Sequence, residues 1–306
     1  MKTLLTRLIY FLKKCHIISD MTIAKLKYRY KCHKRLNLAN PKDINEKINW
    51  LKFYGDTSMW ADLADKYKVR EFIEQKGYKE TLVKLYGKWD SAKEIDWEAL
   101  PNEFVMKANN GCGDIIICKD KSKLDKNQVI EHFNKTLSKI YGIESGEPHY
   151  ASIKPCIIAE ELLDKEKQNI ISNSLVDYKI FCFNGEPYYT FIVANRNSPI
   201  TNIAFYDNNW CDISEQLVPS KHYSPLETKV PKPRNFDAML EMARTLSQGF
   251  PITRVDLYEV DGCVYFGELT FTPLGGYMDY FNEKMLNLMG SKIDLNYGKQ
   301  KGSFYL

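Results

Sequence analysis

Residues 253–273 read TRVDLYEVDGCVYFGELTFTP, a pattern that predicts two strands of a β-hairpin. Two runs of alternating polar and apolar residues flank Asp261-Gly262, a dipeptide that favours the tight two-residue turn of a β-hairpin. Side chains two apart on a strand point to the same face, and hairpin pairing places the two strands side by side. We therefore expect four side chains to meet on one face of the sheet: Arg254, Asp256, Glu268 and Thr270.

These side chains carry the chemistry of a metal site that handles phosphates. Mg²⁺ prefers hard oxygen ligands and keeps part of its coordination for the phosphates of a substrate. The carboxylates of Asp256 and Glu268, with the hydroxyl of Thr270, supply such oxygens. The alternative is a half-buried sheet whose acids form salt bridges on the solvent face, because acid-bearing hairpins are common.

A second motif lies upstream, where residues 104–113 read FVMKANNGCG. An apolar strand ends beside Lys107, a loop with Gly111 and Gly113 follows, and the next residues, DIIIC, predict a return strand. Backbone N–H groups without side-chain bulk around them can approach phosphate oxygens closely. The loop lacks the GxxxxGK[ST] pattern of a Walker A motif, and a plain hairpin with a loose glycine turn is the alternative.

Patterns on either side place both motifs in an α+β chain. Helical stretches are predicted over 41–55 and 59–77, and the second puts Lys66 and Arg70 on one helix face. Downstream, three features predict a mostly antiparallel sheet with helices: a hairpin that turns at Asn184-Gly185, an amphipathic helix over 235–250, and the hairpin at Asp261-Gly262.

Composition limits the class of protein. The chain has 306 residues, of which 44% are hydrophobic and 27% charged, enough for a sizeable core and unlike a disordered chain or a coiled coil. Eight cysteines without a CxxC pair argue against a secreted disulfide framework. The apolar start over 4–12 is too short to span a bilayer and has no signal-peptide cleavage site after it, so we expect a cytoplasmic protein.

Charge is unevenly distributed along the chain. Residues 1–55 hold thirteen Lys/Arg against three Asp/Glu, or +10, and the rest holds 30 against 36, or −6. Apolar residues recur at helical spacing in this basic start, as in a helix that rests on anionic lipid: Leu4, Leu5, Leu8, Ile9 and Leu12. The alternative is a helix packed on the body of the protein. No DNA- or RNA-binding module surrounds the basic run, so nucleic acid is not an expected partner.

Taken in order, the motifs resemble an ATP-grasp ligase over about residues 40–285. Five stretches resemble the TupA-like branch of that superfamily: NPKDINEKINWLKFYG from residue 40, DKYKVREF from 65, IDWEALPNEFVMKANNG from 95, DYKIFCFNGEP from 177 and RVDLYEVDGCVYFGELTFTPLGG from 254. The resemblance implies an α+β ATP-grasp fold. Its expected parts are a basic helical segment over 1–78, a small α/β lid over 79–158 and a larger antiparallel-sheet unit with helices over 159–306.

The resemblance also implies a role for each matched residue. Those implied to bind ATP are Lys66, Lys107, Gly111, Gly113, Glu160, Glu161, Leu162 and Lys179, with Asp164 or Lys167 near the ribose. Those implied to hold Mg²⁺, as two ions, are Asp256, Glu268 and Thr270. Those implied to act in catalysis are Arg254, which would steady the transferred phosphoryl group, and Lys179. Thr270 stands where most ATP-grasp enzymes have asparagine, a departure that is usual for the TupA-like branch.

The implied reaction is ATP-dependent joining of a carboxylate and an amine through an acyl-phosphate. The branch implies an amino acid joined to a carboxyl-bearing sugar or peptide in capsule or other cell-surface polysaccharide biosynthesis, with a lipid-linked saccharide as one such acceptor. The basic segment over 1–55 would then contact the inner membrane face. It also replaces the usual first domain of the superfamily, which leaves the acceptor site unspecified. A phosphotransferase or a glycosyltransferase of the same pathway is the alternative.

Overall fold

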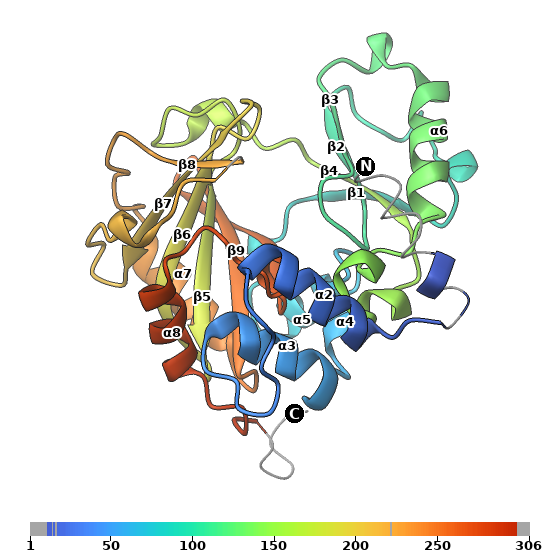
Figure 1. Cartoon of the computed structure of the whole chain (residues 1–306). Helices are drawn as coiled ribbons and strands as arrows, with labels where there is room; N and C mark the ends of the chain where they lie inside the picture. The colour runs from blue at the N-terminus through green and yellow to red at the C-terminus, as the bar shows by residue number, and fades with distance from the viewer. Residues whose placement is uncertain (1–10, 14, 16, 221, 299–306) are drawn as a thin grey trace.

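Two β-sheets organise the computed structural model, which describes residues 11–13, 15, 17–220 and 222–298. The smaller sheet has four strands in the order β1-β4-β2-β3, and each neighbouring pair is antiparallel. Its strands are β1 Leu85–Trp89, β2 Phe104–Ala108, β3 Ile115–Cys118 and β4 Ile157–Glu160. Helix α6 (Lys126–Leu137) lies beside this sheet, on its far side from the larger one (Figure 1).

The larger sheet has six strands in the order β10-β9-β5-β6-β7-β8, antiparallel except for the β7–β8 pair. Its strands are β5 Asp177–Phe183, β6 Glu186–Ala194, β7 Thr201–Asp207, β8 Tyr223–Pro225, β9 Ile252–Val260 and β10 Cys263–Thr270. Helix α7 (Phe236–Ser247) packs on β5, β6 and β9, and α3 (Ile44–Tyr54) packs on α8 (Glu283–Lys292). Among the described residues, no helix has the length and apolar character needed to cross a membrane.

Each sheet buries its own apolar residues. In the small unit, Val129 and Phe133 of α6 pack with Phe104 and Met106 of β2. In the large unit, the core extends from α7 through β5, β6 and β9 to α3 and α8. Because each half has a core, the strands that face each other across the middle are free to carry polar side chains.

Local sequence explains how the main elements begin and turn. The side chains of Ser19, Asp43, Asp125 and Asn282 cap helices by accepting a backbone N–H near the helix start. Both expected hairpins are present, and their turn residues have left-handed φ angles: 51° and 79° at Asn184-Gly185, and 54° and 71° at Asp261-Gly262. The mirror-image turn that matches strand twist requires such angles. The predicted α+β class is confirmed.

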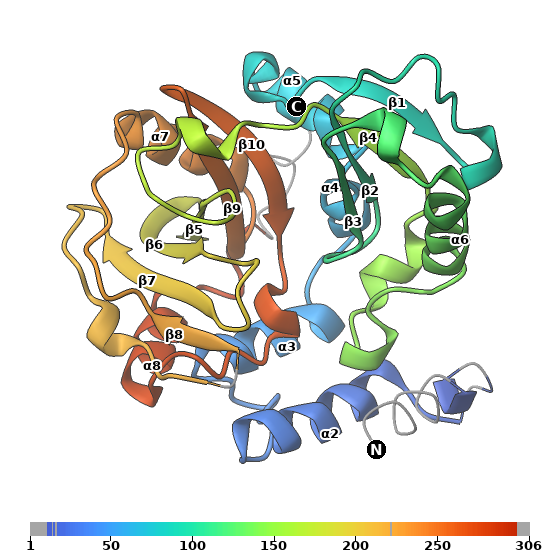
Figure 2. The same ribbon diagram turned by 90° about the horizontal axis from the view of Figure 1, so that it is seen from above.

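Helix α2 (Asp20–Cys32) lies along one edge of both halves (Figure 2). Lys27 donates to the carbonyl of Glu144 at 3.2 Å on the small half, and Lys31 pairs with Asp279 at 3.1 Å on the large half. Tyr28 is fully buried and donates to Asp43 at 3.2 Å. The basic start therefore packs on the body along this helix, whereas Leu4, Leu5, Leu8 and Ile9 lie outside the described residues.

The single helix predicted over 59–77 is wrong. The segment forms α4 (Trp60–Ala64) and α5 (Val69–Gln75), which a turn at Asp65–Lys68 separates. Asp65 accepts the backbone N–H groups of Tyr67 at 2.8 Å and Lys68 at 3.2 Å, so the side chain stabilises the turn in place of continued helix. Lys66 consequently lies in the turn, not on a helix face with Arg70.

The expected three-part division stays a prediction. The four strands of the small sheet end with β4 at Glu160, two residues beyond the boundary expected at 158. The connection to the large sheet then runs from 161 to 176, ahead of β5.

The contact between α8 and the start of α3 gives a test of the packing. A Cβ added to Gly290 would lie 2.2 Å from the carbonyl oxygen of Lys42 and 2.7 Å from the backbone of Asp43. Although alanine favours a helix by about 1 kcal/mol over glycine, we expect Gly290→Ala to destabilise the protein by about 2 kcal/mol through overpacking. Urea unfolding measures the change. Ser291→Ala, one residue on and exposed, is the control and should change stability by less than about 0.5 kcal/mol.

Candidate functional site

The β9–β10 hairpin brings the four expected polar side chains together. Asp256 pairs in register with Glu268, and Arg254 with Thr270. A bulge at Gly267 shifts the register just before Glu268, and there a Cβ would lie 2.9 Å from the carbonyl oxygen of Asp256. Glycine thus permits the close strand approach that places Glu268 opposite Asp256.

The guanidinium of Arg254 contacts the other three side chains. It donates to both oxygens of Asp256, from Nε at 2.7 Å and from Nη2 at 2.8 Å. The same Nη2 lies 3.1 Å from the hydroxyl of Thr270 and 3.4 Å from Oε1 of Glu268. The alternation in the sequence predicted this shared face, and the contacts confirm it.

Strand β5 adds a second cation from the other side of β9. Lys179 pairs in register with Asp256, donates to Oδ2 of that carboxylate, and lies 3.1 Å from Oδ1 of Asp177. All three side chains are less than a tenth exposed. The buried carboxylate of Asp256 therefore meets two cations, which offset the cost of its desolvation.

These ion pairs join into one series of alternating charges, which we call the charge chain. Its outer ends are Arg196, whose Nη2 lies 2.7 Å from Asp177, and Lys66, whose Nζ lies 3.5 Å from Glu268. Four cations and three acids take part, in the order Arg196, Asp177, Lys179, Asp256, Arg254, Glu268 and Lys66.

Lys66 connects the large sheet to the glycine loop between β2 and β3. Its ammonium donates to the carbonyl of Gly111, and its backbone N–H donates to the carbonyl of Asn109 at 3.1 Å. Asn109 in turn donates to Asp65 at 2.8 Å. The turn that replaced the expected helix is therefore what places Lys66 between the loop and Glu268.

The loop itself depends on its two glycines. Gly113 has a φ of 85°, which other residues rarely adopt. At Gly111 a Cβ would lie 2.8 Å from the ring of Tyr141. Between them the thiol of Cys112 lies 2.8 Å from the Tyr141 hydroxyl. A side chain would therefore strain the backbone at Gly113 and would collide with the Tyr141 ring at Gly111.

A second group of charges lies where the two halves are connected. The buried carboxylate of Glu160, at the end of β4, accepts from Lys107 at 2.8 Å and from Arg70 at 3.1 Å. The next backbone N–H, of Glu161, donates to the carbonyl of Lys84 at 2.9 Å. Of the expected hinge residues, Glu160 therefore contacts Lys107 and Glu161 bonds to the small unit, and Leu162 follows directly in the chain.

Two weaker expectations lie away from these clusters. Asp164 accepts the backbone N–H of Glu166 at 3.0 Å, and exposed Lys167 lies 3.4 Å from Asp261 at the tip of the β9–β10 hairpin. Neither contacts the charge chain. Sequence reasoning also missed Asp177 and Arg196; Asp177 lies two residues before Lys179 on the same strand face, a signal that was available, whereas no pattern marked Arg196.

Electrostatics keep Glu268 ionised. Desolvation raises the pKa of its carboxyl, but the positive charges of Lys66, Lys179 and Arg254 outweigh it and lower the pKa below its usual range. At Asp256 burial dominates and raises the pKa, while Arg254 and Lys179 act in the opposite direction. Glu268, the less buried of the two, is the carboxylate better placed to meet a ligand from solvent.

The donor set fits Mg²⁺. Asp256 and Glu268 offer hard carboxylate oxygens from paired strands, and the Thr270 hydroxyl lies 3.2 Å from Glu268. In the described part of the chain no three His, Cys, Asp or Glu side chains gather as a metal site. Two carboxylates suit an ion that shares its coordination with phosphate better than a structural zinc, which needs four protein ligands.

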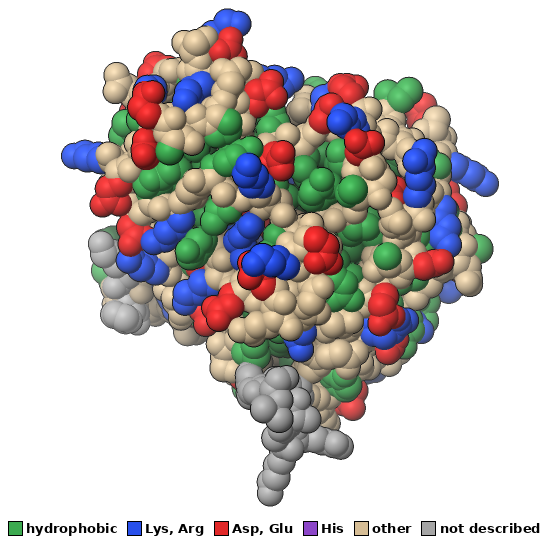
Figure 3. Space-filling model, turned by 180° about the vertical axis from the view of Figure 1, so that it is seen from behind, with side chains coloured by type: hydrophobic (Ala, Val, Ile, Leu, Met, Phe, Trp, Pro, Cys, Tyr) green, Lys and Arg blue, Asp and Glu red, His purple; other side chains and the backbone are tan. Residues whose placement is uncertain are grey.

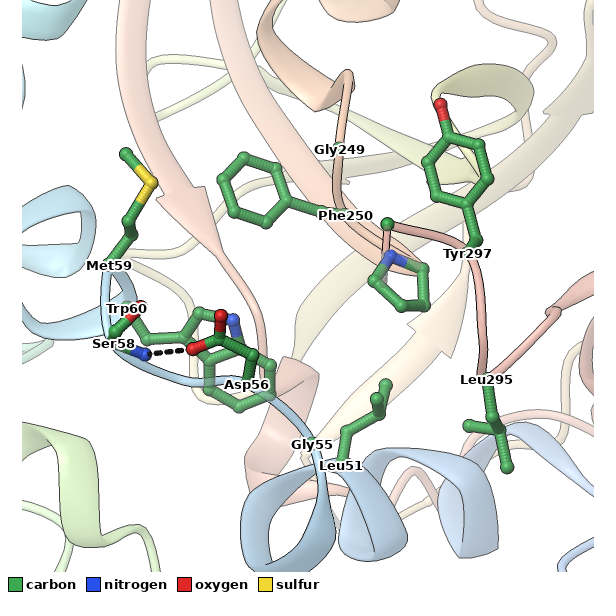
Figure 4. Close-up of a pocket in the computed structure, with 12 residues that line it drawn as sticks. Leu51, Gly55, Asp56, Ser58, Met59, Trp60, Gly249, Phe250, Leu295 and Tyr297 are labelled. Carbon is green, nitrogen blue, oxygen red and sulfur yellow. Dashed lines mark hydrogen bonds between the residues drawn. The ribbon is translucent and has the colours of Figure 1, made fainter. Parts of the chain in front are cut away.

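A separate pocket opens near the α3–α4 connection, and Figure 4 shows the residues around it. Apolar side chains of Leu51, Met59, Phe250 and Leu295 line it, beside Asp56, which accepts the Ser58 N–H at 3.0 Å. None of the expected site residues lines this pocket. We assign it no role in the site.

The lowered pKa of Glu268 has a consequence for stability. Such a group contributes stability that is complete above its ordinary pKa of 4.5 and is lost as pH falls toward the lower folded value. The difference in unfolding free energy between wild type and Glu268→Gln should therefore narrow between about pH 6 and about pH 3, as urea titrations can measure. Glu71→Gln, an exposed acid on α5, is the control. A constant difference for Glu268→Gln would contradict the assigned electrostatics.

Comparison with known proteins agrees with the family expected from the motifs. The sequence matches the TupA-like ATP-grasp family over residues 46–294. No curated protein matches it.

Several solved structures are similar to the chain at low identity. A D-alanine–D-alanine ligase from Bacillus anthracis is 16% identical, with 87% of this chain and 75% of that chain covered and a TM-score of 0.45. The D-alanine–D-alanine ligase from Helicobacter pylori is 13% identical, with 83% and 68% covered and a TM-score of 0.42. The ATP-grasp ligase PsnB, in complex with a phosphomimetic variant of its minimal precursor, Mg and ADP, is 11% identical, with 80% and 65% covered and a TM-score of 0.38.

The family match covers most of the chain. It includes the glycine loop, the hinge region and every residue of the charge chain. This protein therefore belongs to the TupA-like ATP-grasp family and is an enzyme of the ATP-grasp ligase type.

Proposed function

We propose that this enzyme uses Mg-ATP to join a carboxylate to an amine through an acyl-phosphate intermediate. The observation that carries the proposal is the charge chain, in which four cations alternate with three acids. Two of the acids, Asp256 and Glu268, lie on paired strands, and Lys66 at one end contacts the glycine loop. A triphosphate carries several negative charges in a row, and Mg²⁺ brings positive charge beside them. Phosphates can therefore replace carboxylates as partners of the cations, while the metal takes the carboxylates.

In this proposal each group has a stated partner. Lys66, Lys107 and Lys179 bind phosphate oxygens, the loop of Gly111 and Gly113 covers them, and the backbone near Leu162 meets the adenine. Mg²⁺ would be held by Asp256, Glu268 and Thr270. The ion would neutralise negative charge on the β- and γ-phosphates. We propose that two ions bind, a number that a metal titration would measure.

The chemistry proceeds in two displacements. A carboxylate oxygen of the first substrate attacks the γ-phosphorus, the bond to the β–γ bridging oxygen breaks, and ADP leaves. The nitrogen of the amine then attacks the acyl carbon, phosphate leaves with the electron pair of the C–O bond, and the nitrogen loses a proton to form the amide. Arg254 stabilises negative charge on the transferred group in both steps, and the closed loop excludes water that would hydrolyse the acyl-phosphate.

For substrates we propose an amino acid and a carboxyl-bearing sugar or peptide of capsule or other cell-surface polysaccharide synthesis, with a lipid-linked saccharide as acceptor. A phosphotransferase is the second candidate, because transfer of the γ-phosphate to a hydroxyl would use the same charge chain. A glycosyltransferase is disfavoured, since a sugar diphosphate does not require four aligned cations.

The surface of α2 supports a peripheral position at an anionic membrane. Leu26 and Tyr30 are 58% and 70% exposed there, beside the exposed cations Lys25 and Arg29. Exposed apolar side chains next to exposed cations can bind the headgroup region of anionic bilayers. On the opposite side of the molecule, acidic and basic side chains are interspersed (Figure 3). We therefore propose α2 as the membrane-facing element.

The proposed reaction is tested by incubating the protein with ATP, Mg²⁺ and pooled amino acids and uronic acids. We expect ADP, phosphate and a product whose mass is the sum of an amine and a carboxylate less one water, read by mass spectrometry. A phosphorylated acceptor without an added amine would indicate the phosphotransferase. Thermal stabilisation by UDP-sugars and none by an ATP analogue would contradict both.

The metal assignment is tested by substitutions at Glu268 and Thr270. Glu268→Gln removes a charge at nearly constant shape and should lower turnover at least about a hundredfold, because one metal ligand is weakened. Thr270→Asn should be tolerated much better than Thr270→Val, which keeps the shape and removes the oxygen. Near-normal turnover of folded Glu268→Gln, verified by circular dichroism, would show that this carboxylate is structural.

The membrane assignment is tested by co-sedimentation with anionic and neutral vesicles. Each cation near an anionic surface contributes about 1 kcal/mol, so the wild type should pellet with anionic vesicles at low salt and less at high salt. Leu26→Glu and the double variant Lys25→Glu/Arg29→Glu should pellet less. Leu288→Glu, at an exposed leucine of α8 (44% exposed), is the matched control. Equal, negligible pelleting of wild type and variants would rule out membrane contact.

A further inference from the structure

Arg196 is the one cation of the charge chain to which the proposed function gives no role. It lies in the turn after β6 and is 47% exposed, whereas Lys179 and Arg254 are 8% and 10% exposed. The chain is therefore buried in its middle and open to solvent at Arg196. A cation at such a position is accessible to an anion that enters from solvent.

The guanidinium is held in place by a single buried acid. Nε donates to Oδ2 of Asp177 at 2.8 Å, and Nη2 lies 2.7 Å from the same oxygen. Oδ1 of Asp177 lies 3.1 Å from Lys179. Asp177 is thus shared by two cations, and the complete chain of four cations and three acids keeps one positive charge in excess.

The end of the chain at Arg196 is also the end of the large sheet that the connection from the small unit reaches. Asp177 begins β5, directly after the connection from the small unit. The backbone N–H of Asp261, in the turn of the β9–β10 hairpin, donates at 3.0 Å to the carbonyl of Lys167 in that connection. The opposite end leads through Arg254 and Thr270 to Pro273, where β10 leaves the sheet.

Tyr258 shows that this end belongs to the same polar face. It lies two residues beyond Asp256 on β9, and a Cβ on Gly267 would lie 3.1 Å from its ring. Asp177 lies two residues before Lys179, whose strand partner is Asp256, so the guanidinium that Asp177 holds lies at the border of the face that carries Asp256 and Glu268.

We propose that Arg196 binds a phosphate oxygen of the nucleotide, at the phosphate nearest the ribose. This inference rests on the proposed function, in which the adenine lies at the hinge and the Mg²⁺ held by Glu268 lies beside the β- and γ-phosphates. A nucleotide in this orientation lies along the charge chain, with the phosphate nearest the ribose at Arg196 and the terminal phosphate toward Lys66. The planar guanidinium, already oriented by Asp177, offers paired N–H donors that match a phosphate better than an ammonium does.

The experiment measures the affinity of Mg-ADP and of the non-hydrolysable analogue Mg-AMPPNP by isothermal titration calorimetry. Arg196→Gln should weaken both by about tenfold, because a charge-assisted hydrogen bond to a phosphate common to both ligands is lost. Lys66→Gln, at the other end, should weaken Mg-AMPPNP more than Mg-ADP. Arg244→Gln, an arginine of α7 that pairs with Glu186 on the surface, is the matched control and should leave both affinities unchanged.

The outcomes separate this inference from the proposed function. Failure of wild type to bind Mg-AMPPNP would overturn both. Normal binding by wild type and by folded Arg196→Gln would overturn the role of Arg196 alone, as would a lowered melting temperature without loss of affinity, which indicates a structural ion pair with Asp177. If Arg196→Gln does not fold, Arg196→Lys decides: it keeps the charge beside Asp177 but loses the paired donors, so unchanged affinity for both ligands would overturn the proposal.

Discussion

Compensation of buried charge is the constraint on which this site depends. Asp256 is only 1% exposed, and an ion buried so deeply is costly unless opposite charges and hydrogen bonds surround it. Arg254 and Lys179 meet that need from the same strand and from the neighbouring one. Glu268 and Asp177 also need compensating cations. Lys66, beside the glycine loop, pairs with Glu268, and Arg196, which is exposed to solvent, pairs with Asp177. A site of this kind is organised before any ligand arrives.

Backbone features far apart in sequence make the arrangement possible. The bulge at Gly267 brings Glu268 opposite Asp256, and the Asp65 turn directs Lys66 toward Glu268 and the carbonyl of Gly111. The first feature belongs to the large sheet, and the second contacts the loop of the small sheet. The charge chain therefore contacts the small unit through Lys66. Displacement of the small unit would change the contacts of Lys66 first.

Sequence patterns predicted the strand-level features of the site well. Period-two alternation placed Arg254, Asp256, Glu268 and Thr270 on one face, and the two Asx-Gly dipeptides predicted both hairpin turns. The break between α4 and α5 was not predicted, because the apolar spacing over 59–77 suits one helix and the competing bonds from Asp65 act only locally. Arg196 could not be predicted, since its place depends on the tertiary contact with Asp177. Roles assigned by resemblance remain proposals.

We expect Mg²⁺ and the nucleotide to bind to the charge chain together. The phosphates then replace the carboxylates as partners of the cations, and Mg²⁺ binds the carboxylates. Without the metal, Asp256 and Glu268 would stay beside the cations and repel the triphosphate; with it, the carboxylates gain a new partner and release the cations. The most direct measurement is calorimetric titration of AMPPNP in Mg²⁺ and in EDTA. The account predicts that Mg²⁺ tightens binding by at least about tenfold, or about 1.4 kcal/mol. Equal affinity in both buffers would contradict it.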